Sequence, residues 1–458
     1  MELKIRELAK ILESEFIGDK KYLDYPINFE MDSRKSQTGN VFWAIKGINF
    51  DSHQFVVDVM KKGAIMAIVN QDWVLANPNQ IQAYIPVKNS EKAMLKLAKG
   101  YAHKFSATKI GITGSNGKTT TKDMINTVLS STLNGFATSG NYNNHIGVPL
   151  TLFRLKHEHD YAIVEMGTNH PGEIQILSQA TQPHIAIVTN IGPSHLEYFR
   201  SVENIFEEKM TIVKGLNKGG YLVVNADDKF LANLKSTSKY KLVTFGVNNG
   251  QVKPKDLTWD DNACAQFKIG RTQYKLNVPG IHNLYNALAT IAVAQIVKIP
   301  KSKISESLGH YGGSHLRMEI KEVENYKIAA DCYNANPVST SMALQTIAQM
   351  TCSGKKIAVL GDMLELGPES AEMHAELGNH IAELGFDVLC TIGEFSKHIG
   401  QRAKDRGMSP QDIHHFNNNI ALSNFVTQIV GNGDIVLVKA SRGIKLDEVV
   451  SALEKQEG

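Results

Sequence analysis

Cysteine is scarce in this chain, and the few cysteines present lie far apart. Cys264, Cys332, Cys352 and Cys390 form no CxxC pair within the 458 residues. This spacing excludes a disulfide framework and a cysteine-rich zinc site, and it favours a reducing compartment.

An excess of charge of one sign and long apolar runs are also missing. The net charge is +3 with acids and bases interspersed, so no basic stripe points to nucleic acid or to an anionic membrane surface. No run is long and apolar enough to span a membrane, and the charged N-terminal segment MELKIRELAKILESEF is not expected to be a signal peptide. We therefore expect a cytoplasmic protein that binds small polar ligands.

The chain length and the strand pattern predict three α/β domains. The first mixes short strands and helices with a polar, loop-rich stretch at 31–56. The second is predicted to be a doubly wound, mostly parallel sheet of the P-loop ATPase type, and the third a smaller, Rossmann-like α/β domain. The glycine-rich HYGGSHLRM (310–318) is predicted to link them. The predicted domains are residues 1–85, 86–313 and 314–458.

Near-continuous apolar runs mark the strands of the second and third domains. In the second domain they are KIGITG (109–114), YAIVEMG (161–167), HIAIVTNIG (184–192), YLVVNAD (221–227) and KLVTFG (241–246), and a long helix follows over 282–297. In the third domain they are KIAADCY (327–333), KIAVLGDM (356–363), VLCTIG (388–393) and IVLVKASRG (435–443).

A strand, a glycine-rich turn and a helix start lie together in KIGITGSNGKTTT (109–121). Backbone N–H groups of such a turn bind phosphate, Lys118 adds a positive charge, and the Thr119 hydroxyl is a ligand for Mg²⁺. The usual pattern has glycine where this chain has Ile112, and the alternative is an ordinary loop. The strand-loop-helix context favours an ATP or GTP site made by Gly114, Ser115, Asn116, Gly117, Lys118, Thr119 and Thr120.

Glu165 and His195 each follow a predicted parallel strand of the second domain. Open α/β sheets bind ligands beyond the carboxyl ends of their strands, so both side chains are candidates for the phosphate site. The alternative for Glu165 is a carboxylate at a strand end that is hydrogen-bonded within the protein, and the alternative for His195 is a purely structural role. Together with Thr119 they offer oxygen ligands and an imidazole, a set that suits Mg²⁺ or Mn²⁺.

Lys209 lies on the apolar side of a helix predicted over 201–216, with Ser201 as its N-cap. Helical spacing places Lys209 near the middle of the apolar stripe, whereas Glu207 and Glu208 are predicted to point away. One interpretation is that the ammonium reaches water along its four-carbon stem. The other is a lysine carbamate formed with CO₂, which is an anionic ligand that Mg²⁺ would not repel.

These motifs resemble, in the same order, the central domain of the Mur ligases of peptidoglycan synthesis. The matching strings are GITGSNGKTT, VEMG around Glu165, GPSH around His195, and the helix that carries Lys209. Further strings resemble the family members that add D-alanyl-D-alanine. They are DSR (32–34), GNYNNHIGVPLTL (140–152), EMGTNHPGEI (165–174), DCYNANP (331–337) and GDMLELG (361–367).

The resemblance implies an ATP-dependent ligase that joins UDP-MurNAc-tripeptide to D-Ala-D-Ala through an acyl phosphate. The implied cofactors are ATP, two Mg²⁺ ions and a CO₂-derived carbamate on Lys209. The implied catalytic residues are Lys118, Glu165, His195 and Lys209, and the implied metal ligands are Thr119, Glu165, His195 and the Lys209 carbamate. We also expect a monomer without nucleic-acid partners or membrane insertion.

Further binding residues follow from the same resemblance. Asn283 and Asn286 would bind adenine, although Asn283 could instead cap its helix. Arg317 would reach the γ-phosphate, and Asp331 the ribose. The residues implied for the UDP group are Ser33, Arg34 and Lys46, those for the muramoyl peptide Asn141, Asn143 and Asn144, and that for the acceptor carboxylate Arg442.

Two alternatives remain at this point. Another amide ligase of the same superfamily, such as the tripeptide-forming Mur ligase or folylpolyglutamate synthase, would share the central machinery. The DSRKSQTGN and GDMLELG strings favour the D-Ala-D-Ala enzyme. A nucleotide-dependent switch without acyl transfer is less consistent with Glu165, His195 and Lys209, because a switch needs only a phosphate loop and one metal ion.

Overall fold

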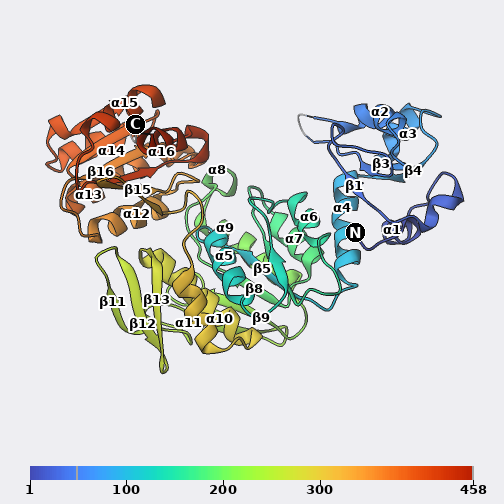
Figure 1. Ribbon diagram of the computed structural model, residues 1–458, viewed down its shortest axis with the longest axis horizontal. Coiled ribbons are helices and arrows are strands. Elements are labelled where there is room, and N and C mark those ends of the chain that lie inside the picture. The colour runs from blue at the N-terminus through green and yellow to red at the C-terminus, as the bar shows by residue number, and fades with distance from the viewer. Residues whose placement is uncertain (48–49, 456–458) are drawn as a thin grey trace.

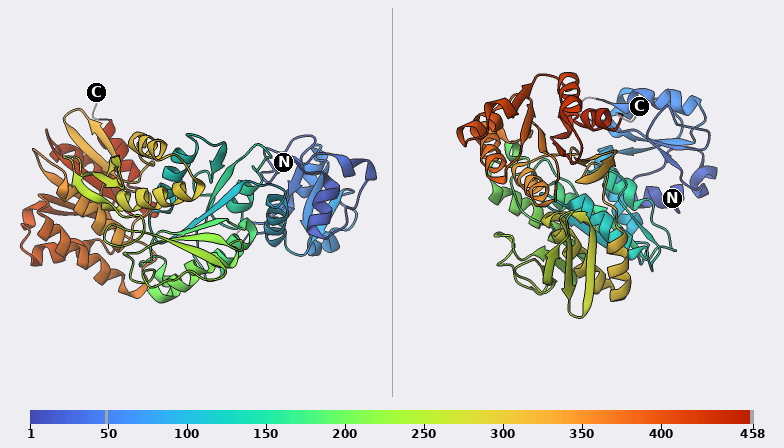
Figure 2. Two further views of the ribbon diagram at one scale, coloured as in Figure 1. Left: turned by 90° about the horizontal axis from the view of Figure 1, so that it is seen from below. Right: turned by 60° about the vertical axis from the view of Figure 1, so that its left-hand side comes forward.

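The computed structural model describes residues 1–47 and 50–455, which form three α/β domains along an elongated molecule (Figure 1). The N-terminal domain lies at one end, the C-terminal domain at the other, and the central domain between them. The left view of Figure 2 shows the same order from below. The predicted fold class is confirmed, while the domain boundaries at residues 85 and 313 remain our proposal. Residues 48 and 49 of the predicted polar loop lie outside the described part.

The N-terminal domain is built on a parallel sheet of order β1-β2-β3-β4. Its helix α1 buries Ile5, Leu8 and Leu12, whose spacing puts them on one helical face. The strands are β1 (Phe29–Glu30), β2 (Val41–Trp43), β3 (Met66–Asn70) and β4 (Tyr84–Val87). The helices are α1 (Ile5–Leu12), η1 (Lys20–Asp24), η2 (Ser52–Phe55), α2 (Val56–Lys61) and α3 (Gln71–Ala76). Helix α4 (Ser90–Ala102) follows the proposed boundary and contacts α1 as well as α6 and α7 of the central domain.

The central domain has a fully parallel sheet of order β10-β9-β8-β5-β7-β6. The strands predicted for this domain are all confirmed, and their apolar runs are largely buried on both faces of the sheet, except in the edge strand β10, which is mostly half-buried. They are β5 (Thr108–Thr113), β6 (Gly135–Ala137), β7 (Tyr161–Glu165), β8 (Ile185–Val188), β9 (Gly220–Asn225) and β10 (Tyr240–Phe245). The helices are α5 (Lys118–Leu129), α6 (Gly147–Leu152), α7 (Glu173–Thr181), α8 (Leu196–Phe199), α9 (Val202–Met210), η3 (Thr211–Lys214), α10 (Ile281–Val297) and α11 (Lys301–His310).

A small antiparallel sheet in the central domain was not predicted. It consists of β11 (Lys255–Trp259), β12 (Cys264–Ile269) and β13 (Thr272–Pro279). Gly270 has φ 61° in the tight turn between β12 and β13, which favours glycine there. The sheet reaches the C-terminal domain, where Thr351 N donates a 2.8 Å hydrogen bond to Asp261 O.

The C-terminal domain has a mixed sheet of order β14-β15-β19-β16-β17-β18, in which only the β14–β15 pair is antiparallel. The strands predicted for this domain are confirmed. They are β14 (Glu319–Val323), β15 (Tyr326–Ala330), β16 (Lys356–Gly361), β17 (Val388–Ile392), β18 (Ile413–Phe416) and β19 (Ile435–Lys439). The helices are α12 (Pro337–Gln349), η4 (Gly367–Glu369), α13 (Ser370–Leu384), α14 (Lys397–Asp405), η5 (Pro410–Asp412), α15 (Asn419–Ile429), η6 (Arg442–Ile444) and α16 (Asp447–Glu454).

The predicted helix over 201–216 is partly wrong. Ser201 caps α9 by accepting from Asn204 N, as expected, but the α-helix ends at Met210 and continues as 3-10 turns. Glu208 does not point to solvent: its carboxylate is buried and accepts from the backbone N–H groups of Gly172 and Ile174 at the start of α7. An anion at a helix N-terminus satisfies unpaired N–H groups, which explains the burial. Within the described ranges, no helix has the length and apolar character required to cross a membrane.

Candidate active site

A cleft of about 780 Å³ lies where the carboxyl ends of the central strands face the C-terminal domain. Most of the residues predicted from the sequence line it together. They are Ser115, Asn116, Gly117, Lys118, Thr119, Thr120, Asn141, Asn143, Asn144, Glu165, His195, Asn283, Asn286, Arg317 and Asp331. The cleft therefore unites side chains from two domains that the sequence placed far apart.

The phosphate loop connects β5 to α5, and two glycines make its shape possible. A Cβ on Gly114 would lie 1.8 Å from Thr189 Oγ1, and Gly117 has φ 78° with a virtual Cβ 2.4 Å from Asn286 Oδ1. Any other residue at these positions would clash with the neighbouring strand end or with α10. Gly117 is followed directly by α5, so the free N–H groups of the helix start face the cleft.

Lys118 is folded back onto this loop. Its Nζ donates to Gly114 O at 2.6 Å and to Ser115 O at 3.3 Å. Burial lowers the pKa of Lys118 to about 8, Arg317 adds to this effect, and Glu165 opposes it. An anionic phosphate in the loop would raise this pKa again and hold the lysine in its charged form.

Glu165 ends β7 with a carboxylate that is almost fully buried. Oε1 accepts from Thr119 Oγ1 at 3.2 Å and from Asn143 Nδ2 at 2.9 Å. Oε2 accepts no hydrogen bond within the described residues, and the nearest cation is Lys122 Nζ at 3.8 Å. A buried carboxylate oxygen without a donor is costly, and a cation held with Thr119 would satisfy it.

His195 precedes α8 and has a left-handed backbone, with φ 54°. Its Nδ1 lies 2.5 Å from Glu365 Oε2, and because a carboxylate only accepts, Nδ1 carries the proton. Burial lowers the pKa of His195, the charges of Lys118 and Lys209 lower it further, and Glu365 opposes them. The ring is therefore held neutral with Nε2 free to accept, the form that binds metal ions.

Lys209 is only 2% exposed, so its side chain does not extend into open solvent. Burial holds the pKa of its amine well below the ordinary value, Lys118 adds to the effect, and Glu208 opposes it. Within the part of the chain that the structure describes, Lys209 Nζ makes no hydrogen bond or ion pair. A lowered pKa favours the neutral amine over the ammonium.

The candidate metal ligands do not form a cluster of the side chains that most often bind metal ions. Across residues 1–47 and 50–455, no group of three or more His, Cys, Asp or Glu side chains is placed to hold a metal ion. Besides Glu165 and His195, the Thr119 hydroxyl offers a further oxygen at this place, 3.2 Å from Glu165 Oε1.

The start of α10 forms another wall of the cleft. Asn283 Nδ2 donates to Pro279 O at 2.8 Å, and Asn286 Nδ2 donates to Asn283 Oδ1 at 3.2 Å. The alternative that Asn283 caps the helix is wrong, because the N-cap position is Gly280. His282 Nδ1 is buried without a hydrogen bond in the described chain, and burial lowers the pKa of His282 to about 4.

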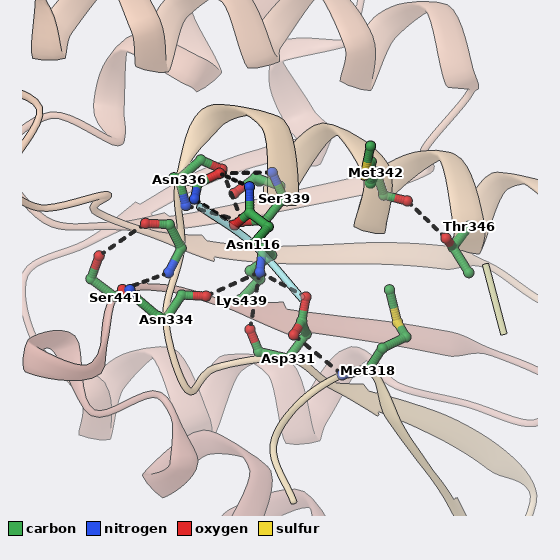
Figure 3. Close-up of polar contacts among 12 residues, drawn as sticks. Asn116, Met318, Asp331, Asn334, Asn336, Ser339, Met342, Thr346, Lys439 and Ser441 are labelled. Atoms are coloured by element: carbon green, nitrogen blue, oxygen red, sulfur yellow. Dashed lines mark hydrogen bonds and ion pairs between the residues drawn. The ribbon is translucent and has the colours of Figure 1, made fainter. Parts of the chain in front are cut away.

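Arg317 and Asp331 enter the cleft from the C-terminal domain. The Arg317 guanidinium lies over the Tyr333 ring, 4.1 Å from its centroid. Asp331 Oδ2 accepts from Lys439 Nζ at 2.7 Å, and this lysine also donates to Asn334 O at 3.1 Å (Figure 3). Lys439, which sequence reasoning missed, is buried and fixes the Asp331 carboxylate at the end of β15 and β19.

A second contact missed from the sequence joins the phosphate loop to α12. Asn336 Nδ2 donates to Asn116 Oδ1 at 2.6 Å, and Asn116 Nδ2 donates back to Asn336 Oδ1 at 3.4 Å. Asn336 Oδ1 also accepts from Ser339 N at 2.9 Å, which caps α12 (Figure 3). The DCYNANP string contained the signal, but nothing in the sequence pairs it with the phosphate loop.

Several predicted residues lie outside the lining of this cleft. Gly114 and Lys209 are not among the lining residues, although Lys209 is near enough to His195 to affect the pKa of its imidazole. In the N-terminal domain, Arg34 is paired with Asp32 through two 2.8 Å hydrogen bonds. The remaining ones are Ser33, Lys46 and Arg442, which likewise do not line the cleft among the residues described.

Family models match two parts of the chain. The Mur ligase middle domain matches residues 112–294, and the Mur ligase glutamate ligase domain matches residues 316–442. The UDP-N-acetylmuramoyl-tripeptide--D-alanyl-D-alanine ligase of Bacillus subtilis (strain 168) is 36% identical over 430 residues, with 92% of each chain covered. This chain belongs to the Mur ligase family.

The similarity extends over the whole Mur ligase chain. The ligase of the same name from Escherichia coli (strain K12) is 33% identical and covers 98% of both chains. A solved structure of MurF from Acinetobacter baumannii has a TM-score of 0.88 at 28% identity, with 99% of both chains covered. MurF from Thermotoga maritima, solved in complex with ADP, has a TM-score of 0.83 at 27% identity and covers 94% of this chain and 97% of that one. The predicted family is confirmed, and the alternative of a nucleotide-dependent switch does not fit it.

Proposed function

We propose that this Mur ligase joins the terminal carboxylate of UDP-MurNAc-tripeptide to the amine of D-Ala-D-Ala, with ATP converted to ADP and phosphate. The observation that carries the proposal is the shared cleft, in which the phosphate loop, Glu165 and His195 face Arg317 and Asp331 of another domain. Full-length similarity to ligases with this name supports the choice of substrates.

The first step activates the carboxylate, which is a poor acylating agent. A carboxylate oxygen attacks the γ-phosphorus of ATP, and the bond from that phosphorus to the β-phosphate oxygen breaks, which releases ADP. Lys118 and the loop N–H groups hold the β- and γ-phosphates, and Arg317 approaches from the other domain. Positioning and charge neutralisation are the main contributions that a protein makes to such a transfer.

The second step forms the amide. The amine nitrogen of D-Ala-D-Ala attacks the acyl carbon, phosphate leaves with the bonding electron pair, and the nitrogen loses its proton. Water would destroy the acyl phosphate, so the contact between the central and C-terminal domains protects it.

The metal sites belong to the same proposal. Thr119 and Glu165 would hold one Mg²⁺, and His195 with a carbamate on Lys209 would hold a second. When bound, the two cations neutralise the carboxylate and phosphate charges so that two anions can meet. The buried Glu165 Oε2, which accepts no hydrogen bond among the described residues, and the lowered pKa of the buried Lys209 amine support this assignment.

The substrate contacts outside the cleft are also proposed. Ser33, Arg34 and Lys46 would bind UDP, and Arg442 would bind the carboxylate of D-Ala-D-Ala. Arg442 lies beside the GDMLELG loop, since Leu364 N donates to Ser441 Oγ at 2.9 Å. The muramoyl peptide would be bound by Asn141, Asn143 and Asn144. The adenine of ATP would be bound by Asn283 and Asn286. We further propose that the chain acts as a monomer in the cytoplasm.

Phosphate release with each substrate alone and with both together tests the proposed reaction. We expect ATP-dependent release only when UDP-MurNAc-tripeptide and D-Ala-D-Ala are both present, with UDP-MurNAc-pentapeptide as the product by mass spectrometry. Turnover with UDP-MurNAc-dipeptide and a diamino acid, but not with this pair, would assign the chain to the tripeptide-forming reaction instead.

A further inference from the structure

Two residues with left-handed backbones meet across the boundary between the central and C-terminal domains. His195 has φ 54° in the GPSH loop, and Glu365 has φ 62° in the GDMLELG loop. Residues other than glycine adopt this conformation rarely, and it persists only where surrounding contacts enforce it. The pairing of two such residues indicates that their relative position matters.

Glu365 makes two hydrogen bonds to the segment GPSHLE (192–197). Its side chain accepts from His195 Nδ1 at 2.5 Å, and its backbone oxygen accepts from Glu197 N at 3.2 Å. Gly367 packs on the same segment, with a virtual Cβ 3.6 Å from Glu197 Cα. The side-chain contact is thus supported by a main-chain contact at the same place.

The loop that presents Glu365 is rigidly anchored in its own domain. Met363 N donates to Nε2 of the fully buried His374 at 2.9 Å, and His374 Nδ1 donates to Ser370 O at 2.6 Å. Leu366 is buried in the domain core. A carboxylate on such a loop is already ordered, so it can orient a partner side chain with a smaller loss of conformational entropy.

We infer that Glu365 is a positioning residue that fixes the tautomer and orientation of His195 from the neighbouring domain. The inference rests on the proposed function, in which His195 Nε2 binds a divalent cation. By accepting the Nδ1 proton, Glu365 leaves the lone pair on Nε2 and raises its basicity. The contact exists only while the two domains touch, so it links His195 orientation to domain contact.

The inference is tested with Glu365→Ala and Glu365→Gln, and with Glu369→Gln as a matched control in the same loop. Histidine ¹⁵N NMR of the metal-free protein reports the tautomer, and titration with Mn²⁺ in the presence of ADP reports metal affinity. In E365A we expect the His195 signal to leave the Nδ1–H form, with a loss of about 10- to 100-fold in Mn²⁺ affinity. In E365Q the tautomer should persist, because the amide oxygen still accepts, while affinity falls less. E369Q should match the wild type.

His195→Ala separates failure of this inference from failure of the proposed metal site. If H195A weakens Mn²⁺ binding but E365A leaves both the tautomer and the affinity at wild-type values, the positioning role is wrong. If H195A also binds Mn²⁺ as the wild type does, His195 is not a ligand and the proposed metal site fails with it.

Discussion

At the scale of single residues, burial makes Lys209 chemically different from the other lysines of its segment. Lys214, five residues further on, is exposed, whereas burial holds the pKa of the Lys209 amine well below its ordinary value. A side chain that is costly to charge and has no partner is a candidate for covalent modification, here by CO₂.

Replacement of Lys209 by Ala should lower the ligation rate by on the order of 10²–10³, because one charged group near the transferring phosphate is lost. Added acetate should restore part of the rate by supplying a carboxylate in the vacated space. The rate is measured by phosphate release in buffers with and without bicarbonate, and Lys214→Ala serves as the control. Near-full activity of K209A without bicarbonate would rule out the carbamate.

His282 offers a prediction on stability. Its pKa in the folded chain is about 4, well below the ordinary value near 6.5, so between these values only the unfolded chain binds the proton. The free energy of unfolding should therefore fall as the pH drops from 6.5 to 4, with a slope of at most about 1.4 kcal/mol per pH unit from this residue. Above pH 6.5 the imidazole is neutral in both states and contributes no slope.

Urea unfolding of the wild type and of His282→Gln at several pH values measures this contribution as the difference between the two curves. Protonation of carboxylates affects both proteins alike and cancels in the difference. Parallel curves between pH 6.5 and 4 would show that His282 accepts a proton freely in the folded chain.

At the scale of elements, the N-terminus of α12 has two roles. Asn336 caps the helix through Ser339 N and also pairs with Asn116 of the phosphate loop. A cap alone contributes about 1 kcal/mol, and the amide pair adds a link between two domains. The helix start is therefore coupled to the loop that binds nucleotide.

Asn336→Ala should lower stability by about 1 kcal/mol and also raise the KM for ATP several-fold, because the phosphate loop loses its contact with α12. Asn418→Ala is the matched control, since Asn418 caps α15 by accepting from Ala421 N at 2.8 Å and has no contact with the loop. It should lose similar stability without a change in KM. Equal KM values for the two variants would contradict a role of the amide pair in nucleotide binding.

At the scale of the whole molecule, the N-terminal domain lies far from the contact between the other two (Figure 1). The proposed UDP ligands Ser33, Arg34 and Lys46 are in that domain, and they do not belong to the described lining of the nucleotide cleft. One substrate must bind in both places for its carboxylate to meet ATP. A change in domain arrangement is therefore expected when both ligands bind.

Small-angle X-ray scattering measures this change. We expect the radius of gyration to decrease when UDP-MurNAc-tripeptide is added with a non-hydrolysable ATP analogue, towards the value of about 23 Å for a compact chain of this length. The analogue alone should have a smaller effect, because the central and C-terminal domains already touch through Asn116 and Asn336. An unchanged radius with both ligands would mean that the tripeptide spans the open arrangement.

The linker is an element whose position the sequence predicted but whose anchoring it did not. Gly313 has φ 99° in the predicted glycine-rich segment. Ser314 Oγ donates to Asp123 Oδ2 at 2.6 Å, which ties the linker to α5 directly behind the phosphate loop. Sequence spacing identifies a flexible segment, but the partner that holds it lies 191 positions away.

The sequence by itself determined the strands with near-continuous apolar runs, the phosphate loop and the identity of Glu165, His195 and Lys209 as the unusual residues, but not the antiparallel sheet β11–β12–β13. Each of these signals is local: apolar runs mark buried parallel strands, glycines mark the loop, and helical spacing exposes a misplaced charge. The prediction that Glu208 points to solvent was wrong. Within its own helix Glu208 has the spacing of an ordinary surface residue, and the sequence does not show that its carboxylate binds the N-terminus of another helix.

Only the tertiary structure decided which residues meet across the domain boundary. The Asn116–Asn336 pair and the contact between Glu365 and His195 each join positions more than 100 residues apart. No local pattern encodes such contacts, because they depend on how separately folded sheets pack together. The sequence therefore determined the chemical groups, and the packing of the domains determined their orientation and protonation.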